Sequence, residues 1–201
     1  MREVNGLAIA CMLAEPRRSS LTGARVPGAP ATLYVGLGSN LGDRLGTLQA
    51  AARQLRDGAV PGTVLVRSSP VYETRPLGPS TAVYMNAVIE LRTVAEPMAL
   101  LSALQMLELR HGRTRRTRWE ARTLDLDILM WLPMGVDGLF LDVPGLRLPH
   151  PELARRDFVL APLAALEPGL RPTGGASVAE LLAGLDADER TIVAQVAEQL
   201  C

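Results

Sequence analysis

The sequence contains no lysine, so all 21 of its basic residues are arginines. A phosphate-binding loop of the Gly-Lys-Ser/Thr type needs a lysine ammonium on the β- and γ-phosphates, and Schiff-base enzymes need a lysine amine as nucleophile. Both classes are therefore excluded. Any phosphate site in this chain must depend on arginine side chains, backbone amides or a metal ion.

Cysteine and histidine are also scarce. Cys11 and Cys201 lie near opposite ends and outside any motif, which is unlike a disulfide framework and indicates a reducing compartment. The presence of only His111 and His150 excludes most multi-histidine metal sites. The first residues carry both an arginine and a glutamate, which is a poor start for an export signal. We therefore expect a cytoplasmic protein.

The 21 arginines are balanced by 21 acidic residues, so no overall charge attracts DNA or an anionic membrane. Aromatic residues make up 3% of the chain, which is few for a base-stacking RNA-binding surface. The chain has 201 residues, 48% of them apolar, and this is enough for one well-buried core. No stretch has the pattern of a membrane span. We expect one globular domain whose partners are small molecules rather than nucleic acid or membrane.

The chain divides into three parts. Residues 1–30 end in a Pro-, Gly-, Arg- and Ser-rich stretch, which predicts a disordered or extraneous extension. Residues 31–185 form the predicted domain, and apolar residues at helical spacing predict a helical tail over residues 186–201. Within the domain the patterns predict strands over residues 32–36, 64–72, 84–92 and 123–130, and helices over 43–56 and 97–112. This order favours an α+β domain with a mainly antiparallel sheet flanked by helices.

Asp125 and Asp127 alternate with apolar residues in the last of these strands. Alternate side chains share one face of a strand, so the two carboxylates start about 6 to 7 Å apart while their neighbours point to the core. Two carboxylates at this distance suit a hard cation such as Mg²⁺ that also binds the phosphates of a substrate. The alternative is the exposed face of an edge strand.

Residues 110–122 contain six arginines, among them Arg113, Arg115 and Arg122, together with Trp119. Such a density of like charge must be solvated or paired, so the alternatives are a solvated loop, a nucleic-acid patch or a polyphosphate site. Arginine forks match phosphate oxygens bidentately. Because this stretch precedes the two carboxylates, the sequence favours a polyphosphate site that the loop closes.

A third group of residues suits a flat polar ring. Tyr84 and Asn86 share one strand face, where the phenol ring offers a stacking surface and the amide offers donors and acceptors. The turn over residues 74–78 has backbone groups that are free of sheet pairing, and Phe158 is one of two phenylalanines. Core packing is the alternative role for both rings. His150 and Arg156 are further candidates for phosphate contacts. Gln105 and Glu108 lie three apart on one face of the second helix, and their alternative role is that of ordinary solvent-facing residues.

These motifs, taken together over residues 32–185, resemble the 6-hydroxymethyl-7,8-dihydropterin pyrophosphokinase family. The resemblance rests on Gly-Leu-Gly-Ser-Asn-Leu-Gly-Asp at 36–43, Tyr-Glu-Thr with Pro-Leu-Gly at 72–78, Tyr-Met-Asn-Ala at 84–87, Arg-Thr-Leu-Asp-Leu-Asp-Ile at 122–128, and Leu-Pro-His-Pro at 148–151 with Arg156 and Phe158.

The resemblance implies a ferredoxin-like fold and transfer of the β,γ-diphosphate of ATP to the pterin hydroxymethyl group, with release of AMP, in a monomeric enzyme of folate biosynthesis. Asp125 and Asp127 would hold two Mg²⁺ ions, and Arg113, Arg115, Arg122 and Asp127 would be the catalytic set. The residues expected to bind ATP are Gln105, Glu108, Arg113, Arg115, Trp119, Arg122, His150 and Arg156. The pterin would be bound by Thr74, Leu77, Tyr84, Asn86 and Phe158.

The chain departs from the family pattern at two places. In the arginine-rich loop, Glu120-Ala121 stands where Gly-Pro is common, and the loop is one residue short. In the turn over residues 74–78, Arg75 replaces a common proline. Two other classes share part of the pattern: a different metal-dependent phosphotransferase, which leaves Tyr84 and Asn86 unexplained, and a ferredoxin-like RNA-binding domain, which requires surface aromatics on the sheet.

Overall fold

The computed structural model describes residues 29–77, 82–113, 122–135 and 138–201. The predicted extension over residues 1–30 lies outside this part of the chain, except for Ala29 and Pro30. In the described residues, no helix has the length and apolar character needed to cross a membrane.

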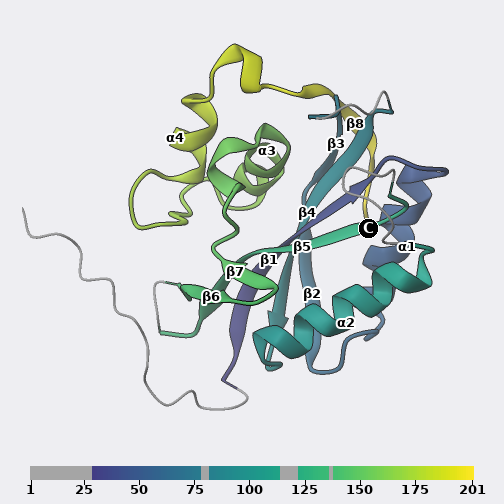
Figure 1. Cartoon of the computed structure of the whole chain (residues 1–201), viewed down its shortest axis with the longest axis vertical. Coiled ribbons are helices and arrows are strands. Elements are labelled where there is room, and N and C mark those ends of the chain that lie inside the picture. Colours follow the sequence, from purple (N-terminus) through teal and green to yellow (C-terminus); the bar gives the residue numbers. More distant parts are fainter. Residues whose placement is uncertain (1–28, 78–81, 114–121, 136–137) are drawn as a thin grey trace, which may run out of the picture.

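An antiparallel sheet forms the centre of the molecule (Figure 1). Its strands run in the order β5-β1-β4-β3-β8, and β2 also pairs with β4. Their bounds are β1 (Ala31–Ser39), β2 (Thr63–Ser68), β3 (Pro70–Thr74), β4 (Tyr84–Thr93), β5 (Asp125–Pro133) and β8 (Ile192–Gln199). Helices lie between β1 and β2 and between β4 and β5. With β2 and β3, which both pair with β4, counted as one strand, the arrangement is βαββαβ. The predicted ferredoxin-like α+β fold is confirmed.

Helices cover both faces of this sheet. Successive side chains of a strand point to opposite faces, so each strand contributes to two hydrophobic cores. On β1, Leu33 and Val35 pack into the core beneath α1 (Arg44–Arg56) and α2 (Pro97–Arg110), whereas Tyr34 packs on the opposite side. That second core lies beneath α3 (Asp157–Leu166) and α4 (Val178–Ala183). Figure 1 shows the two helix pairs on opposite sides of the sheet.

The two long helices begin and end close to the positions that the sequence predicts. The Asp43 side chain caps α1 by accepting from the amide of Gly46 at 2.9 Å. Pro97 occupies the first turn of α2, where its missing N–H costs no hydrogen bond. Gly112, with φ at 79°, follows the C-terminal end of α2 in a conformation that favours glycine.

The predicted strand over residues 64–72 is two strands, because Ser69 interrupts the pairing with β4. The Ser69 amide donates to the carbonyl of Val88, and the Ser69 hydroxyl accepts from the amide of the same Val88. Pro70 has no N–H to continue the ladder. The chain therefore steps from β2 to β3 at this point.

The predicted helical tail over residues 186–201 is wrong. After a short 3₁₀ turn (Ala187–Glu189), residues Ile192–Gln199 form β8, which pairs with the edge of β3. Ile192, Val196 and Leu200 are four apart, and an even spacing also places them on one face of a strand. The β-branched side chains and the open edge of β3 favour the strand.

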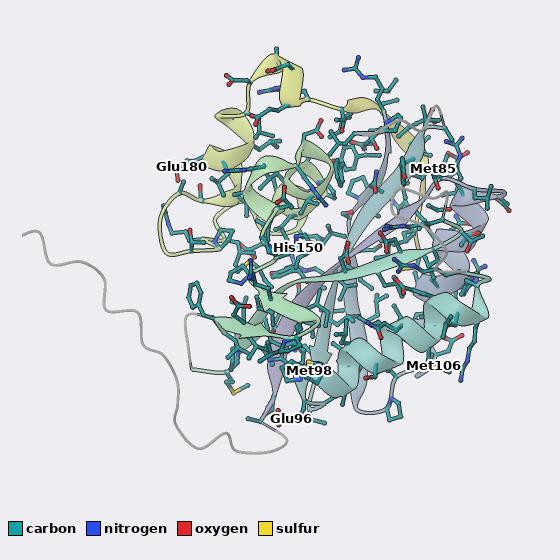
Figure 2. The ribbon with its side chains drawn as sticks, viewed as in Figure 1. Met85, Glu96, Met98, Met106, His150 and Glu180 are labelled. Atoms are coloured by element: carbon teal, nitrogen blue, oxygen red, sulfur yellow. The ribbon has the colours of Figure 1, made fainter. Side chains whose placement is uncertain are left out.

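Between β5 and α3 the chain forms a small hairpin, β6 (Leu141–Val143) with β7 (Leu146–Leu148), and then a 3₁₀ turn (Leu153–Arg155). The connection from β7 carries His150, whose amide donates to the carbonyl of Leu129 on β5 at 2.8 Å. Figure 2 shows His150 between the hairpin and α3. The connection thus places His150 beside β5, an edge strand of the sheet.

Candidate active site

A cavity of about 290 Å³ opens where β1, β4 and β5 meet the turn after β3 and the start of α3. It brings together ten of the residues that the sequence analysis singles out: Thr74, Leu77, Tyr84, Asn86, Arg122, Asp125, Asp127, His150, Arg156 and Phe158. Arg115 and Trp119 lie outside the described residues, as do Glu120 and Ala121.

The floor of the cavity is open because β1, which lies between β4 and β5, has a glycine at position 38. Gly38 pairs with Asn86 on β4 and with Asp125 on β5. A Cβ on Gly38 would lie 3.1 Å from Asn86 Oδ1 and 3.8 Å from Asp125 Cβ. Only glycine leaves the space between the amide and the carboxylate free.

One end of the cavity contains a buried amide, that of Asn86. Asn86 is 8% exposed, and its Nδ2 donates to the hydroxyl of Thr74 at 2.7 Å. This bond fixes the orientation of the amide, and the half-buried Tyr84 lies two residues away on the same strand face. Arg75 to Leu77 continue the wall from Thr74.

The first turn of α3 supplies the opposite wall. The guanidinium carbon of Arg156 lies 5.6 Å from the centre of the Phe158 ring, which is cation–π distance. Arg156 Nε is buried and has no hydrogen-bond acceptor among the described residues. A buried cationic N–H without an acceptor is costly, so this donor suits an anionic ligand.

Asp125 is held by two arginines from the ends of the arginine-rich stretch. Arg113 Nη1 lies 2.7 Å from Asp125 Oδ1, and Arg122 Nη1 lies 2.6 Å from Oδ2. Arg113 also forms an ion pair with Glu108 of α2. Both arginines therefore lie beside the carboxylate pair. In the sequence, Arg113 directly precedes residues 114–121 and Arg122 directly follows them.

The Asp127 carboxyl has a pKa that its surroundings raise. It reaches solvent in the open cleft, but the surrounding protein removes part of its hydration, and this loss raises its pKa; the neighbouring Asp125 charge acts in the same direction. His150 is a smaller opposing influence. Two carboxylates that repel each other at a cleft are a natural site for a cation.

His150 is held in one tautomer when neutral. Its Nδ1 accepts from the amide of Glu152 at 3.2 Å, so the proton of a neutral ring is on Nε2. Loss of hydration in the protein lowers the pKa of His150, although Asp127 acts against this change. The ring is therefore a donor toward the cleft.

Glu108 and Gln105 do not line the cavity. Glu108 is 2% exposed, and its Oε1 accepts from the amide of Leu126 at 2.8 Å. Burial raises the pKa of Glu108 to about 7, against the influence of the Leu126 amide and Arg113. The structure thus makes Glu108 a support for Arg113 and β5, whereas Gln105 is half-buried on α2.

A second, more open hollow lies beyond Asp127 and His150, which border both spaces. Its other walls come from β5, α2 and the β6–β7 hairpin: Leu101, Ile128, Asp142, Val143, Gly145, Leu146, Arg147 and Pro151. The site is therefore a pair of adjoining hollows that meet at an aspartate and a histidine.

The carboxylates alone do not enclose a metal ion. Among the described residues no group of three or more His, Cys, Asp or Glu side chains could hold one. Mg²⁺ commonly uses one or two carboxylates and takes its other ligands from water and substrate phosphates. The oxygen donors of Asp125 and Asp127 fit that mode of binding.

Comparison with known proteins agrees with this geometry. The model of the family 7,8-dihydro-6-hydroxymethylpterin-pyrophosphokinase (HPPK) matches residues 34–168. The chain belongs to the HPPK family. The match spans the strands and helices that build both hollows, while β8 and residues 190–192 lie beyond it.

Curated relatives in the HPPK family are named 2-amino-4-hydroxy-6-hydroxymethyldihydropteridine pyrophosphokinase. One from Pseudomonas aeruginosa is 45% identical over 152 residues, 75% of this chain and 90% of the relative. One from Bacillus subtilis is 40% identical over 134 residues, 66% of this chain and 76% of the relative. Both alignments cover most of the relative's own length.

Among solved structures, the HPPK-DHPS protein of Plasmodium falciparum (wild type, with SDX-DHP) has the same fold. The TM-score is 0.57 at 13% sequence identity, with 77% of this chain aligned. The alignment covers 44% of that longer chain. This likeness concerns the fold alone.

The sequence analysis missed several residues that shape the HPPK site. Gly38 belongs to the first family motif, but its place between Asn86 and Asp125 depends on the strand order. Asn40 follows in the same motif and bonds to Arg122 across the sheet. Asp157 lies between Arg156 and Phe158, both of which the sequence analysis assigns to the site. This position in the sequence is the only local sign of its importance.

Proposed function

We propose that this protein transfers the β,γ-diphosphate of ATP to the hydroxymethyl group of 6-hydroxymethyl-7,8-dihydropterin and releases AMP, a step of folate biosynthesis. The observation that carries the proposal is the meeting of two hollows at Asp127 and His150. One hollow has a fixed amide and aromatic walls, and the other has apolar walls beside acidic and basic groups. Two different substrates can therefore approach each other at the carboxylates.

The pterin ring occupies the cavity between Tyr84 and Phe158, where both faces of a flat ring meet aromatic surface. Asn86 pairs with the polar edge of the ring, and the backbone of Leu77 offers further donors and acceptors. Thr74 is paired within the sheet and acts through its hydroxyl, which orients the Asn86 amide. In this orientation the hydroxymethyl group points to Asp127.

ATP occupies the second hollow, with its phosphates directed to the shared boundary. His150 borders both hollows, and Arg122 and Arg156 line the first hollow. These three side chains bind the phosphate oxygens that reach the boundary. Arg113, with Arg115 and Trp119 of the loop, joins them when ATP is present, whereas Gln105 lines neither hollow and is left out of this assignment. The ion pairs of Arg113 and Arg122 with Asp125 exchange for phosphate contacts, which frees Asp125 for a cation.

Two Mg²⁺ ions bound by Asp125 and Asp127 would neutralise charge on the diphosphate in the transition state. The protein's own residues do the positioning. The hydroxymethyl oxygen forms a bond to the β-phosphorus and loses its proton, while the bond from that phosphorus to the α,β-bridging oxygen breaks and AMP leaves. Arginine side chains stabilise the charge that develops on the phosphate oxygens.

We further propose that the enzyme is monomeric and cytoplasmic, and that it acts on these small molecules without nucleic acid or membrane, in keeping with its balanced charge.

The test is to incubate the protein with ATP, Mg²⁺ and 6-hydroxymethyl-7,8-dihydropterin and to identify the nucleotide product. AMP that appears only with pterin supports the proposal. ADP would mean transfer of a single phosphoryl group and would reject attack at the β-phosphorus. The absence of any pterin-dependent product would reject the proposed reaction.

A further inference from the structure

The C-terminal segment connects the two walls of the pterin cavity. From α4 it passes over the end of α3 to reach β8 beside β3 (Figure 1). One wall contains Arg75 and the other contains Phe158. Residues 190–192, which lie beyond the family match, bond to both walls.

The wall at α3 holds this segment through a buried carboxylate. Asp157 is 2% exposed, and its Oδ1 accepts from the Thr191 hydroxyl at 2.6 Å and from the Phe158 amide at 2.8 Å. Its Oδ2 accepts from the amides of Thr191 and Ile192. One carboxylate therefore fixes the backbone of Phe158 and the C-terminal segment at the same time.

The wall at β3 holds the same residue from the other side. The Thr191 carbonyl accepts from the Arg75 amide at 2.9 Å, and the Arg190 carbonyl accepts from Arg75 Nη2 at 2.9 Å. Ile192 pairs with Thr74, whose hydroxyl accepts from Asn86. Thr191 itself is 5% exposed.

We propose that Thr191 is a positioning residue that sets the spacing between Phe158 and the turn at Thr74 to Leu77, and so governs pterin affinity. This inference rests on the proposed function, because it assigns the pterin to that cavity. A flat ring makes full contact only when its walls stand at the correct distance, and hydrogen bonds to a buried carboxylate are strong enough to hold them there.

The experiment compares Thr191→Val with Thr191→Ser. Valine keeps the shape but loses the hydroxyl bond to Asp157, while serine keeps that bond. We expect Thr191→Val to raise the KM for the pterin about tenfold, with kcat and the KM for ATP within about twofold of the unmodified protein. Thr191→Ser should restore the pterin KM. Val193→Ala, at a 59% exposed position of β8, is the matched control.

Four outcomes would overturn the inference. Equal effects of Thr191→Val on both KM values would indicate general loosening. A fall in melting temperature and active fraction with unchanged KM values would indicate a purely structural role. Failure of the unmodified protein to bind pterin by calorimetry would refute the proposed function itself, whereas normal binding by both the unmodified protein and Thr191→Val would refute only the role of Thr191.

If Thr191→Val does not fold, Arg75→Met tests the same connection from the exposed side. Methionine keeps the apolar stem of Arg75 but loses the bond to the Arg190 carbonyl. We expect a raised pterin KM in Arg75→Met, with kcat and the KM for ATP within about twofold of the unmodified protein. An unchanged pterin KM, or an equal rise in both KM values, would overturn the proposal.

Discussion

Asn40 and Arg122 hold each other through two hydrogen bonds across the end of the sheet. The Asn40 amide donates to the Arg122 carbonyl at 3.1 Å, and the Arg122 amide donates to Asn40 Oδ1 at 2.6 Å. Asn40 is 4% exposed, so little solvent competes for these bonds. They fix the point at which the arginine-rich stretch enters β5, directly before the two carboxylates.

We predict that Asn40→Ala lowers kcat about tenfold and the free energy of unfolding by about 1 to 3 kcal/mol, because the buried Arg122 amide loses its acceptor. Steady-state kinetics and urea denaturation measure the two effects. Leu41→Ala, at the neighbouring 48% exposed position, is the control. Normal kcat in Asn40→Ala would show that Arg122 does not need this anchor.

Asp127→Asn should abolish the reaction while preserving the fold. We expect kcat to fall at least about a hundredfold, since a neutral amide is a poor ligand for Mg²⁺. The fold raises the pKa of Asp127 and so disfavours its charged form. Because asparagine carries no charge, the melting temperature of Asp127→Asn at pH 8 without Mg²⁺ should be higher than that of the unmodified protein.

The control for Asp127→Asn is Asp57→Asn, because Asp57 is an exposed carboxylate next to α1. A lower melting temperature in Asp127→Asn would contradict the repulsion between the two active-site carboxylates. Turnover within about twofold of normal would remove Asp127 from the catalytic set.

Glu108 should make stability depend on pH. Its pKa of about 7 in the folded protein lies above the ordinary value of 4.5. The fold therefore favours the protonated form, and this contribution is complete below about pH 4.5 and is lost as the pH rises through about 7.

We predict that the free energy of unfolding falls between pH 5 and pH 8 by about 2 kcal/mol more in the unmodified protein than in Glu108→Gln. Denaturation at both pH values measures this difference, and subtraction removes the contribution of other titrating groups. An identical pH dependence in the two proteins would show that Glu108 keeps its ordinary pKa, with the Arg113 ion pair outweighing burial.

Tyr84→Ala should weaken pterin binding about tenfold or more and leave ATP binding within about twofold, because the lost group is a stacking surface. Isothermal titration with each ligand separates the two effects. Tyr84→Phe keeps the ring and should bind pterin normally. Weakened binding in Tyr84→Phe would instead assign the role to the hydroxyl group.

Local patterns were enough to predict much of the fold and many of the residues that line the cavity. The alternation around Asp125 and Asp127 predicts their common face, and the cavity contains both. Asp43 and Pro97 mark the starts of α1 and α2 because capping depends on neighbours in sequence. The predicted binding roles of the site residues stay predictions that the experiments above address.

What the sequence left open depends on partners far away in the chain. A spacing of four in Ile192 and Val196 fits a helix and a strand equally, and the free edge of β3 decides between them. Asn40 gains its importance from Arg122, 82 positions away. The pairing of Asp157 with Thr191 spans 34 positions and joins segments that local propensity cannot relate.

The position of β8 has a consequence for biosynthesis. β3 keeps an open edge until residues 192–199 have emerged from the ribosome and paired with it. The strands and helices before them can already assemble, whereas the connection from Arg75 to Phe158 needs residues 190–192. The substrate cavity is therefore among the last features to be completed, and a chain stopped before residue 190 would present an unpaired edge to its neighbours, with a tendency to aggregate.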